Sequence, residues 1–258
     1  MMPLKLKGRT LNPDGHALIC TPLVARTASG LQDELASILP KQPDVIEWRV
    51  DFFEEIHDLV RVIHVARAIR QAAGAIPIIF TCRASHEGGE AISLAEEMVV
   101  ALYEQACASG TVDIIDYELS QPAENRARLR AASRAHEVAM IMSYHNFKGT
   151  PASAELVDKI TDAAQQGADI AKVAVMPQAP GDVLVLLEAT LLASQRVPIP
   201  LITMSMGPVG TMTRLCGWMF GSTLTFAVGS QSSAPGQMAI EDLRAALETM
   251  ERAVFGGS

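Results

Sequence analysis

The sequence predicts an α/β protein, a single (β/α)8 barrel domain that spans residues 1–258. Three observations favour this class. Short β-branched or apolar runs alternate with longer helical patterns, eight such pairs follow one another at a spacing of roughly 30 residues, and a barrel of eight units needs about this length. No Pro/Ser-rich linker divides the chain, so we expect one domain.

The strands are expected where β-branched and apolar residues form short runs. In chain order these runs are ALICT (17–21), VIEWRV (45–50), IPIIFTCR (76–83), TVDIIDYEL (111–119), VAMIMSYH (138–145), DIAKVAV (169–175), PLITMSM (200–206) and LTFAVG (224–229). Near-continuous apolar runs of this kind are typical of parallel strands that are buried on both faces.

The helices are expected in the segments between these runs, near 28–39, 55–73, 91–109, 122–135, 152–166, 181–195, 208–219 and 237–254. Helical spacing of apolar residues is clearest in the second, third and eighth, for example at Leu59, Ile63, Ala66 and Ile69. A doubly wound sheet is the competing fold, but the first strand–helix turn, TPLVARTASG, lacks the G-x-G-x-x-G pattern of dinucleotide-binding folds.

The charge and composition exclude several classes of partner. A net charge of −8 and a pI near 5.3 argue against a nucleic acid or an anionic membrane, because the long-range field repels polyanions. The four cysteines form no CxxC pair, the first sixteen residues contain no apolar signal-peptide core, and VLVLLEATLLA is too short to span a bilayer. We therefore expect a soluble, cytoplasmic protein without a metal site, whose basic residues form a local site for a small anion.

Polar residues fall on the interior positions of the predicted strands, near their carboxyl ends, where barrel enzymes build their active sites. Alternation places Ala139, Ile141, Ser143 and His145 on the interior side of the fifth strand, and Ile170, Lys172 and Ala174 on that of the sixth. By the same alternation, one mouth collects Glu47, Arg49, Arg83, His145, Lys172 and Arg214.

Each of these residues also has a purely structural interpretation. Lys172 could be an ion-paired or snorkelling lysine, and His145 a hydrogen-bonded strand-end histidine without chemistry. Glu47 and Arg49 could pair with each other. Arg83 could be a solvated loop residue, and Arg214 an ordinary residue in the first turn of a helix. Their convergence at one mouth is what favours a functional site.

A lysine and a histidine at such a mouth indicate imine chemistry. An amine in an apolar pocket among other cations is driven towards its neutral, nucleophilic form, and it can then attack a ketone or aldehyde. A histidine can remove the proton that the imine acidifies and later return it. Three arginines would hold a carboxylate or phosphate. The residues alone therefore predict imine chemistry on a small anionic carbonyl compound.

The chain also resembles a known family, the type I 3-dehydroquinate dehydratases. The matching segments are VIEWR (45–49), FTCR (80–83), EGGE (87–90), SYHNF (143–147), ADIAKVAVMP (168–177), MSMGPVGTMTRL (204–215) and SSAPGQ (232–237). The resemblance implies a barrel, usually a homodimer, that converts 3-dehydroquinate to 3-dehydroshikimate in the shikimate pathway. It implies no cofactor and no metal, because the iminium acts as the electron sink.

The resemblance also assigns roles to residues. It implies that Lys172 forms the Schiff base, that His145 is the acid/base group and that Asp116 orients this histidine. The implied substrate-binding residues are Thr21, Glu47, Arg49, Arg83, Arg214, Ser233 and Gln237. Glu87 matches an acidic residue of the loop after the third strand, and Met206 and Phe226 match apolar groups that line the site. At Thr21 the chain departs from the family, where a serine is expected.

The Gly/Ser/Pro-rich segment GSQSSAPGQ (229–237) is predicted to be a lid over the site. Two other functions remain open. A class I aldolase also uses a lysine imine, but the eighth loop here offers no basic residue for a phosphate. A non-catalytic barrel that binds an anionic metabolite would need neither Lys172 nor His145.

Overall fold

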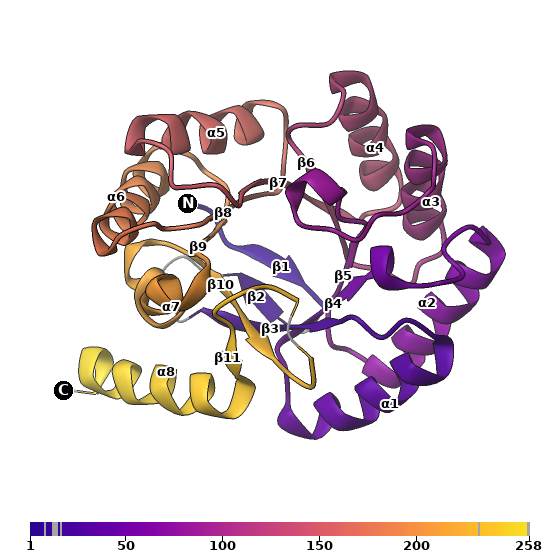
Figure 1. Ribbon diagram of the computed structural model, residues 1–258, viewed down its shortest axis with the longest axis horizontal. Helices are drawn as coiled ribbons and strands as arrows, with labels where there is room; N and C mark the ends of the chain where they lie inside the picture. Colours follow the sequence, from indigo (N-terminus) through magenta and orange to yellow (C-terminus); the bar gives the residue numbers. More distant parts are fainter. Residues whose placement is uncertain (8, 12–14, 16, 232, 257–258) are drawn as a thin grey trace.

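Nine parallel strands curl around a common axis and helices cover them on the outside in the computed structural model, which describes residues 1–7, 9–11, 15, 17–231 and 233–256 (Figure 1). The order of strands in the sheet is β11-β10-β3-β4-β5-β6-β7-β8-β9. Their bounds are β3 Leu18–Leu23, β4 Val45–Arg49, β5 Ile78–Thr81, β6 Ile114–Glu118, β7 Ala139–Asn146, β8 Ile170–Val175, β9 Leu201–Ser205, β10 Leu224–Val228 and β11 Met238–Ala239.

The helices that follow the strands are α1 Ala28–Ile38, α2 Leu59–Ala73, α3 Glu96–Ala108, α4 Ala123–Ala135, α5 Ser153–Gln165, α6 Pro180–Arg196, α7 Gly207–Cys216 and α8 Ile240–Phe255. The sheet closes between β9 and β10, where Leu201 bridges Ser222 and the backbone N–H of Thr223 donates to the Leu201 carbonyl at 2.8 Å. The predicted barrel is confirmed.

Local capping and pairing explain where the observed elements differ from the predicted ones. Helix α2 begins at Leu59, later than predicted, because the carboxylate of Asp58 accepts from the N–H of Arg61 and caps the helix there. Strand β5 ends at Thr81, earlier than predicted, because the N–H of Arg83 donates to Asp51 Oδ1 rather than to a neighbouring strand.

Two groups of apolar side chains confirm the predicted alternation along the strands. The barrel interior is filled by Leu11, Leu18, Cys20, Val45, Ile79, Ile114, Ile141, Ile170, Ala174, Ile202, Met204, Met206, Leu224 and Phe226. Side chains of the opposite parity, such as Trp48 and Phe80, pack under the helices, where their rings meet edge to face at 5.6 Å. Towards the carboxyl ends, β4, β6, β7 and β8 also present polar residues to the interior, whereas β9 and β10 stay apolar there.

A short antiparallel hairpin, which the sequence analysis missed, closes the amino end of the barrel. It consists of β1 (Leu4–Leu6) and β2 (Arg9–Leu11). Leu11 is fully buried in the interior cluster, and Leu4 and Leu6 pack against it. Within the residues that the structure describes, no helix is both long and apolar enough to cross a membrane.

Candidate active site

Residues of five strands, β4, β7, β8, β9 and β10, and of the segments that follow strands surround a cavity at the carboxyl ends of the strands. Its walls are Glu47, Arg49, Arg83, Glu87, Gly88, His145, Phe147, Lys172, Ala174, Met204, Met206, Phe226, Ser233, Ala234 and Gln237. The volume is about 40 Å³, which is enough for a water molecule or two but not for a six-membered ring. The convergence predicted from the strand parities is therefore present, and a larger ligand needs the mouth to open.

Lys172 is one of the residues that form the cavity wall. It stands on β8, one interior position beyond Ile170, and its side chain is 6% exposed. Its Nζ donates to Asp116 Oδ2 at 2.7 Å, lies 3.6 Å from Glu47 Oε1 and is 4.8 Å from the centre of the Phe226 ring. The direct partners of this amine are two carboxylates, which corrects the prediction that cations surround it.

Asp116 connects Lys172 to the nearest cation. It accepts from Lys172, from Arg83 Nη2 at 2.8 Å and from Ser143 Oγ at 2.6 Å. Burial would raise the pKa of Asp116, but the charges of Arg83 and Lys172 outweigh it and hold this pKa well below its usual range. Among the described residues no hydrogen bond joins Asp116 to His145, although the charge of each affects the pKa of the other, so its implied role in orienting the histidine stays a prediction. Register explains the missing bond: Asp116 pairs with Ile141 on β7, and His145 lies further along that strand.

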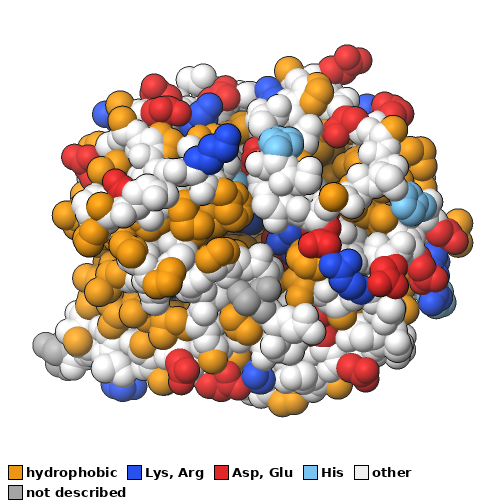
Figure 2. All heavy atoms as spheres, in the orientation of Figure 1, with side chains coloured by type: hydrophobic (Ala, Val, Ile, Leu, Met, Phe, Trp, Pro, Cys, Tyr) orange, Lys and Arg blue, Asp and Glu red, His pale blue; other side chains and the backbone are white. Residues whose placement is uncertain are grey.

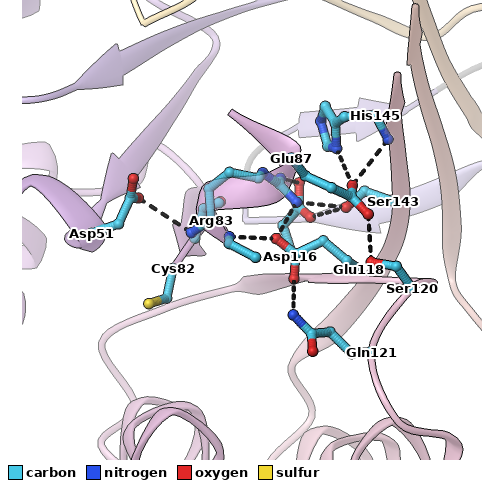
Figure 3. Close-up of polar contacts among 12 residues, drawn as sticks. Asp51, Cys82, Arg83, Glu87, Asp116, Glu118, Ser120, Gln121, Ser143 and His145 are labelled. Atoms are coloured by element: carbon cyan, nitrogen blue, oxygen red, sulfur yellow. Dashed lines mark hydrogen bonds and ion pairs between the residues drawn. The ribbon is translucent and has the colours of Figure 1, made fainter. Parts of the chain in front are cut away.

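Glu87 holds His145 by hydrogen bonds. Its Oε2 lies 2.9 Å from His145 Nδ1 and also accepts from the backbone N–H of His145 at 3.0 Å (Figure 3). Burial, together with the positive charges of Arg83 and Lys172, lowers the pKa of His145 well below its ordinary value. The imidazole is therefore neutral at pH 7 and can accept a proton.

The two arginines in the cavity wall are held by acidic partners. Arg49 forms a bidentate pair with Asp51 at 2.8 and 2.7 Å, so the alternative that it pairs with Glu47 is wrong. Arg83 is 3% exposed and bonds Glu118 at 2.8 Å in addition to Asp116, so it is not a solvated loop residue. These pairs fix both guanidinium groups before any ligand arrives.

Arg214 lies beside the cavity on α7 and is 1% exposed, so it is not an ordinary helix-surface residue. Its Nη2 donates to the Pro235 carbonyl at 3.1 Å and its Nη1 to the Phe226 carbonyl at 3.4 Å, while its buried Nε has no partner. No acidic side chain of the described residues pairs with it, and burial lowers its pKa to about 10. The site thus contains a buried cation that lacks an anion.

The segment 229–237 lies over the cavity, except that its residue 232 falls outside the described residues. Ser233 and Gln237 line the cavity and bond each other, Ser233 N–H to Gln237 Oε1 and Gln237 Nε2 to Ser233 Oγ, both at 3.2 Å. The Pro235 carbonyl accepts from the N–H of Gly207 at 3.1 Å. Met206 and Phe226 add apolar wall below this segment.

The structure does not bring Thr21 to the cavity, which corrects its implied contact with substrate. Thr21 pairs with Ile46 across β3 and β4, and paired residues of parallel strands point to the same side. Ile46 packs under the helices, and Thr21 is likewise fully buried, with its hydroxyl unpartnered. The sequence analysis had not assigned the parity of this strand.

Four side chains to which the sequence alone assigned no role hold the site together: Asp51, Glu118, Ser120 and Ser143. Parity was the available signal for two of them. Glu118 shares the interior side of β6 with Asp116, and Ser143 shares that of β7 with His145. Asp51 and Ser120 lie beyond strand ends, where no periodicity applies.

A closed barrel with a buried lysine, a neutral histidine and unneutralised arginine charge at the carboxyl ends of its strands defines a class, the (β/α)8-barrel enzymes. The family model for the type I 3-dehydroquinase matches residues 19–253, and the chain belongs to this family. The resemblance drawn from its motifs is thereby confirmed.

Relatives of the chain carry the same description over their whole length. A 3-dehydroquinate dehydratase of Albidiferax ferrireducens is 52% identical over 255 residues, which cover 99% of this chain and 97% of the relative. The solved 3-dehydroquinate dehydratase of Geobacillus kaustophilus has a TM-score of 0.95 at 45% identity. The match covers 97% of this chain and 96% of the Geobacillus chain. A type I 3-dehydroquinate dehydratase from Clostridium difficile, solved with covalently modified comenic acid, has a TM-score of 0.94 at 36% identity. The match covers 98% of this chain and 99% of the Clostridium chain.

Proposed function

We propose that the protein dehydrates 3-dehydroquinate to 3-dehydroshikimate, the third step of the shikimate pathway to chorismate, through an imine on Lys172. The observation that carries the proposal is the placement of a buried amine and a neutral imidazole in the walls of one cavity. Membership of the type I family supports the substrate and the reaction.

The first half of the reaction joins the substrate to the enzyme. The amine of Lys172 adds to the C3 carbonyl carbon, and the carbonyl oxygen becomes the hydroxyl of a carbinolamine. His145 moves protons between the nitrogen and this hydroxyl, which leaves as water. The iminium that remains withdraws electrons from C2, so the hydrogen on that carbon becomes acidic.

The second half removes water from the substrate. His145 takes the C2 proton, and the electron pair is held as an enamine conjugated with the nitrogen. The C1 hydroxyl then leaves as water and receives the proton that His145 carries, so the histidine returns to its neutral form. Water hydrolyses the imine, which releases the product and frees Lys172.

The charged groups around the cavity support roles in binding. Arg214, the buried cation without an anion, would hold the substrate carboxylate. Glu47, Arg49 and Arg83 would bind ring hydroxyls. Glu87 would orient His145, and Met206 and Phe226 would cover the apolar face of the ring.

The segment 229–237 would act as a lid. The present volume of about 40 Å³ cannot hold the substrate, so the walls must move during each cycle. Ser233 and Gln237, which bond each other now, would exchange these bonds for bonds to the substrate on closure.

A homodimer is part of the same proposal. Large apolar side chains are exposed on one side of the molecule, over α6, α7 and the following turn: Leu184, Leu191, Val209, Met212 and Met219 (Figure 2). Patches of this kind mark protein interfaces. Met212→Glu combined with Leu184→Glu should convert a dimer to a monomer in light scattering, whereas Val60→Glu, on the exposed face of α2, should not. A wild-type monomer at micromolar concentration would contradict this part.

A cytoplasmic location is also proposed. All four cysteines are free thiols, and three of them are buried. Reduced cysteines are typical of proteins that work in a reducing compartment.

Borohydride reduction in the presence of 3-dehydroquinate tests the reaction. Reduction should leave a secondary amine of matching mass on the peptide that contains Lys172, and the adduct should be absent from Lys172→Arg. Trapping with a sugar phosphate but not with 3-dehydroquinate would indicate an aldolase instead. Substrate binding with neither an adduct nor turnover would indicate a non-catalytic barrel.

A further inference from the structure

A chain of hydrogen bonds leads from the site to the protein surface. His145 Nδ1 lies 2.9 Å from Glu87 Oε2, and Glu87 Oε1 lies 2.5 Å from Ser120 Oγ (Figure 3). Ser120 Oγ in turn lies 3.3 Å from His86 Nε2. Glu87 is 4% exposed, whereas Ser120 and His86 are exposed. The outer half of this hydrogen-bond chain, Ser120 and His86, has no role in the function proposed above.

The chemistry of the groups fixes the direction of the two inner bonds. An ionised carboxylate only accepts, so the single hydroxyl proton of Ser120 goes to Glu87 Oε1. The other oxygen, Oε2, accepts from the backbone N–H of His145 and from its Nδ1–H. With its proton on Nδ1, the imidazole presents Nε2 with a free electron pair.

We propose that Ser120 is a positioning residue for catalysis: its hydroxyl occupies Glu87 Oε1 and keeps this carboxylate ionised and aimed at His145, so that Nε2 of the imidazole is the base. This inference rests on the proposed function of His145. It concerns a residue in the turn after β6, outside the cavity wall.

The surroundings of Glu87 determine what the loss of the hydroxyl would do. Arg83, from the end of β5, favours its ionised form, and Glu118 on β6 opposes it. His145 on β7 donates to it, and His86 on its own turn reaches it through Ser120. Burial raises the pKa of Glu87, and the bond from Ser120 counteracts this rise.

Without the hydroxyl, the carboxyl group would keep its proton at a higher pH. A protonated Glu87 donates rather than accepts, so it would bond to the electron pair of Nδ1 and leave the hydrogen on Nε2. The histidine would then be unable to take the C2 proton. Activity should therefore fall on the acid side of the pH profile.

A matched pair of substitutions tests this. Ser120→Thr keeps the hydroxyl. Ser120→Val has the same shape as the threonine variant but no hydroxyl, and its methyl group occupies the place where a water molecule could otherwise replace the hydroxyl. In Ser120→Val the acid limb of kcat against pH should move up by about one unit, because a hydrogen bond to a charged group has about this effect. KM should stay within about twofold, and Ser120→Thr should follow the unaltered protein. Ser85→Ala, a serine change at an exposed position of the turn that contains Glu87, is the control.

An unshifted acid limb in Ser120→Val would overturn the inference, and so would a lower Tm without a shift, because that result marks a structural role only. If the valine variant does not fold, Ser120→Ala gives the same comparison with a smaller side chain, and ¹⁵N chemical shifts of the His145 ring report its tautomer directly. Borohydride trapping on Lys172 separates the two proposals. An adduct in Ser120→Val with an unshifted limb removes only the role of Ser120, whereas no adduct in the unaltered protein removes the proposed function.

Discussion

Lys172 donates to Asp116 at 2.7 Å, and both side chains are almost or fully excluded from solvent. Asp116 does not depend on this bond alone, because Arg83 and Ser143 also donate to it. The carboxylate therefore keeps two partners when the amine leaves it to attack a substrate. The reactive group can be removed without leaving an isolated buried charge.

Lys172→Ala should abolish turnover and the borohydride adduct while the barrel stays folded. The free energy of unfolding should fall by about 1.5–3 kcal/mol, the range for one hydrogen bond to a charged group. Circular dichroism, urea unfolding and a turnover assay measure these quantities. Lys159→Ala, on α5, should leave turnover unchanged. Full activity of Lys172→Ala would contradict the imine mechanism.

His145→Ala should reduce kcat by about 10²–10⁴, the usual contribution of general acid–base catalysis. The amine at position 172 remains, so borohydride should still trap an adduct at long incubation. Rapid-quench trapping and steady-state kinetics check the two outcomes, with His64→Ala on the exposed face of α2 as the matched control. An unchanged kcat in His145→Ala would contradict the assignment.

The lowered pKa of His145 should also make stability depend on pH. Below about pH 6.5, His145 binds a proton in the unfolded protein but stays unprotonated in the folded protein, where it is buried. The unfolded state then binds more protons, so the free energy of unfolding falls as the pH decreases from 6.5 towards the folded pKa. His145→Ala should show a shallower decrease over this range in urea titrations. Parallel curves for the two proteins would show that the imidazole is not buried in its neutral form.

Arg214→Met should weaken substrate binding without weakening the fold. The guanidinium is buried without an acidic partner, so its removal leaves no carboxylate unpaired. KM should rise by about a hundredfold, as expected when one partner of a buried charge pair is truncated, while the Tm stays level or increases. Arg67→Met, at an exposed position of α2, should change neither quantity.

Gly236→Ala should open the lid. Gly236 has a φ of +76°, and a Cβ there would lie 2.3 Å from the backbone oxygen of Gly207. Alanine is strained at that φ, and the close contact would push the lid away from α7. Limited proteolysis within 229–237 should become faster and KM should rise. Gly149→Ala, where a Cβ meets nothing within 4 Å, is the control.

Strand periodicity explains why so much of the site could be predicted. Glu47, His145 and Lys172 repeat the parity of apolar residues earlier in their strands, so their convergence follows from the barrel alone. Their roles in catalysis remain predictions.

The pairing of these side chains could not be predicted in the same way. Whether Asp116 meets Lys172 or His145 depends on the stagger between neighbouring strands, and Glu87 reaches His145 from a loop. Neither leaves a periodic pattern in the sequence. The hairpin at the amino end was missed because its strands have three residues each, too few for any periodicity.

The hairpin formed by β1 and β2 affects how substrate and product reach and leave the site. Leu11 and its neighbours fill the amino end of the barrel, and the cavity lies at the carboxyl end beneath the segment 229–237. We expect substrate and product to enter and leave at this same end of the barrel, so that bound product prevents the next substrate molecule from binding. Accumulated 3-dehydroshikimate should therefore slow the enzyme by occupying the same place as 3-dehydroquinate, and added substrate should relieve the inhibition.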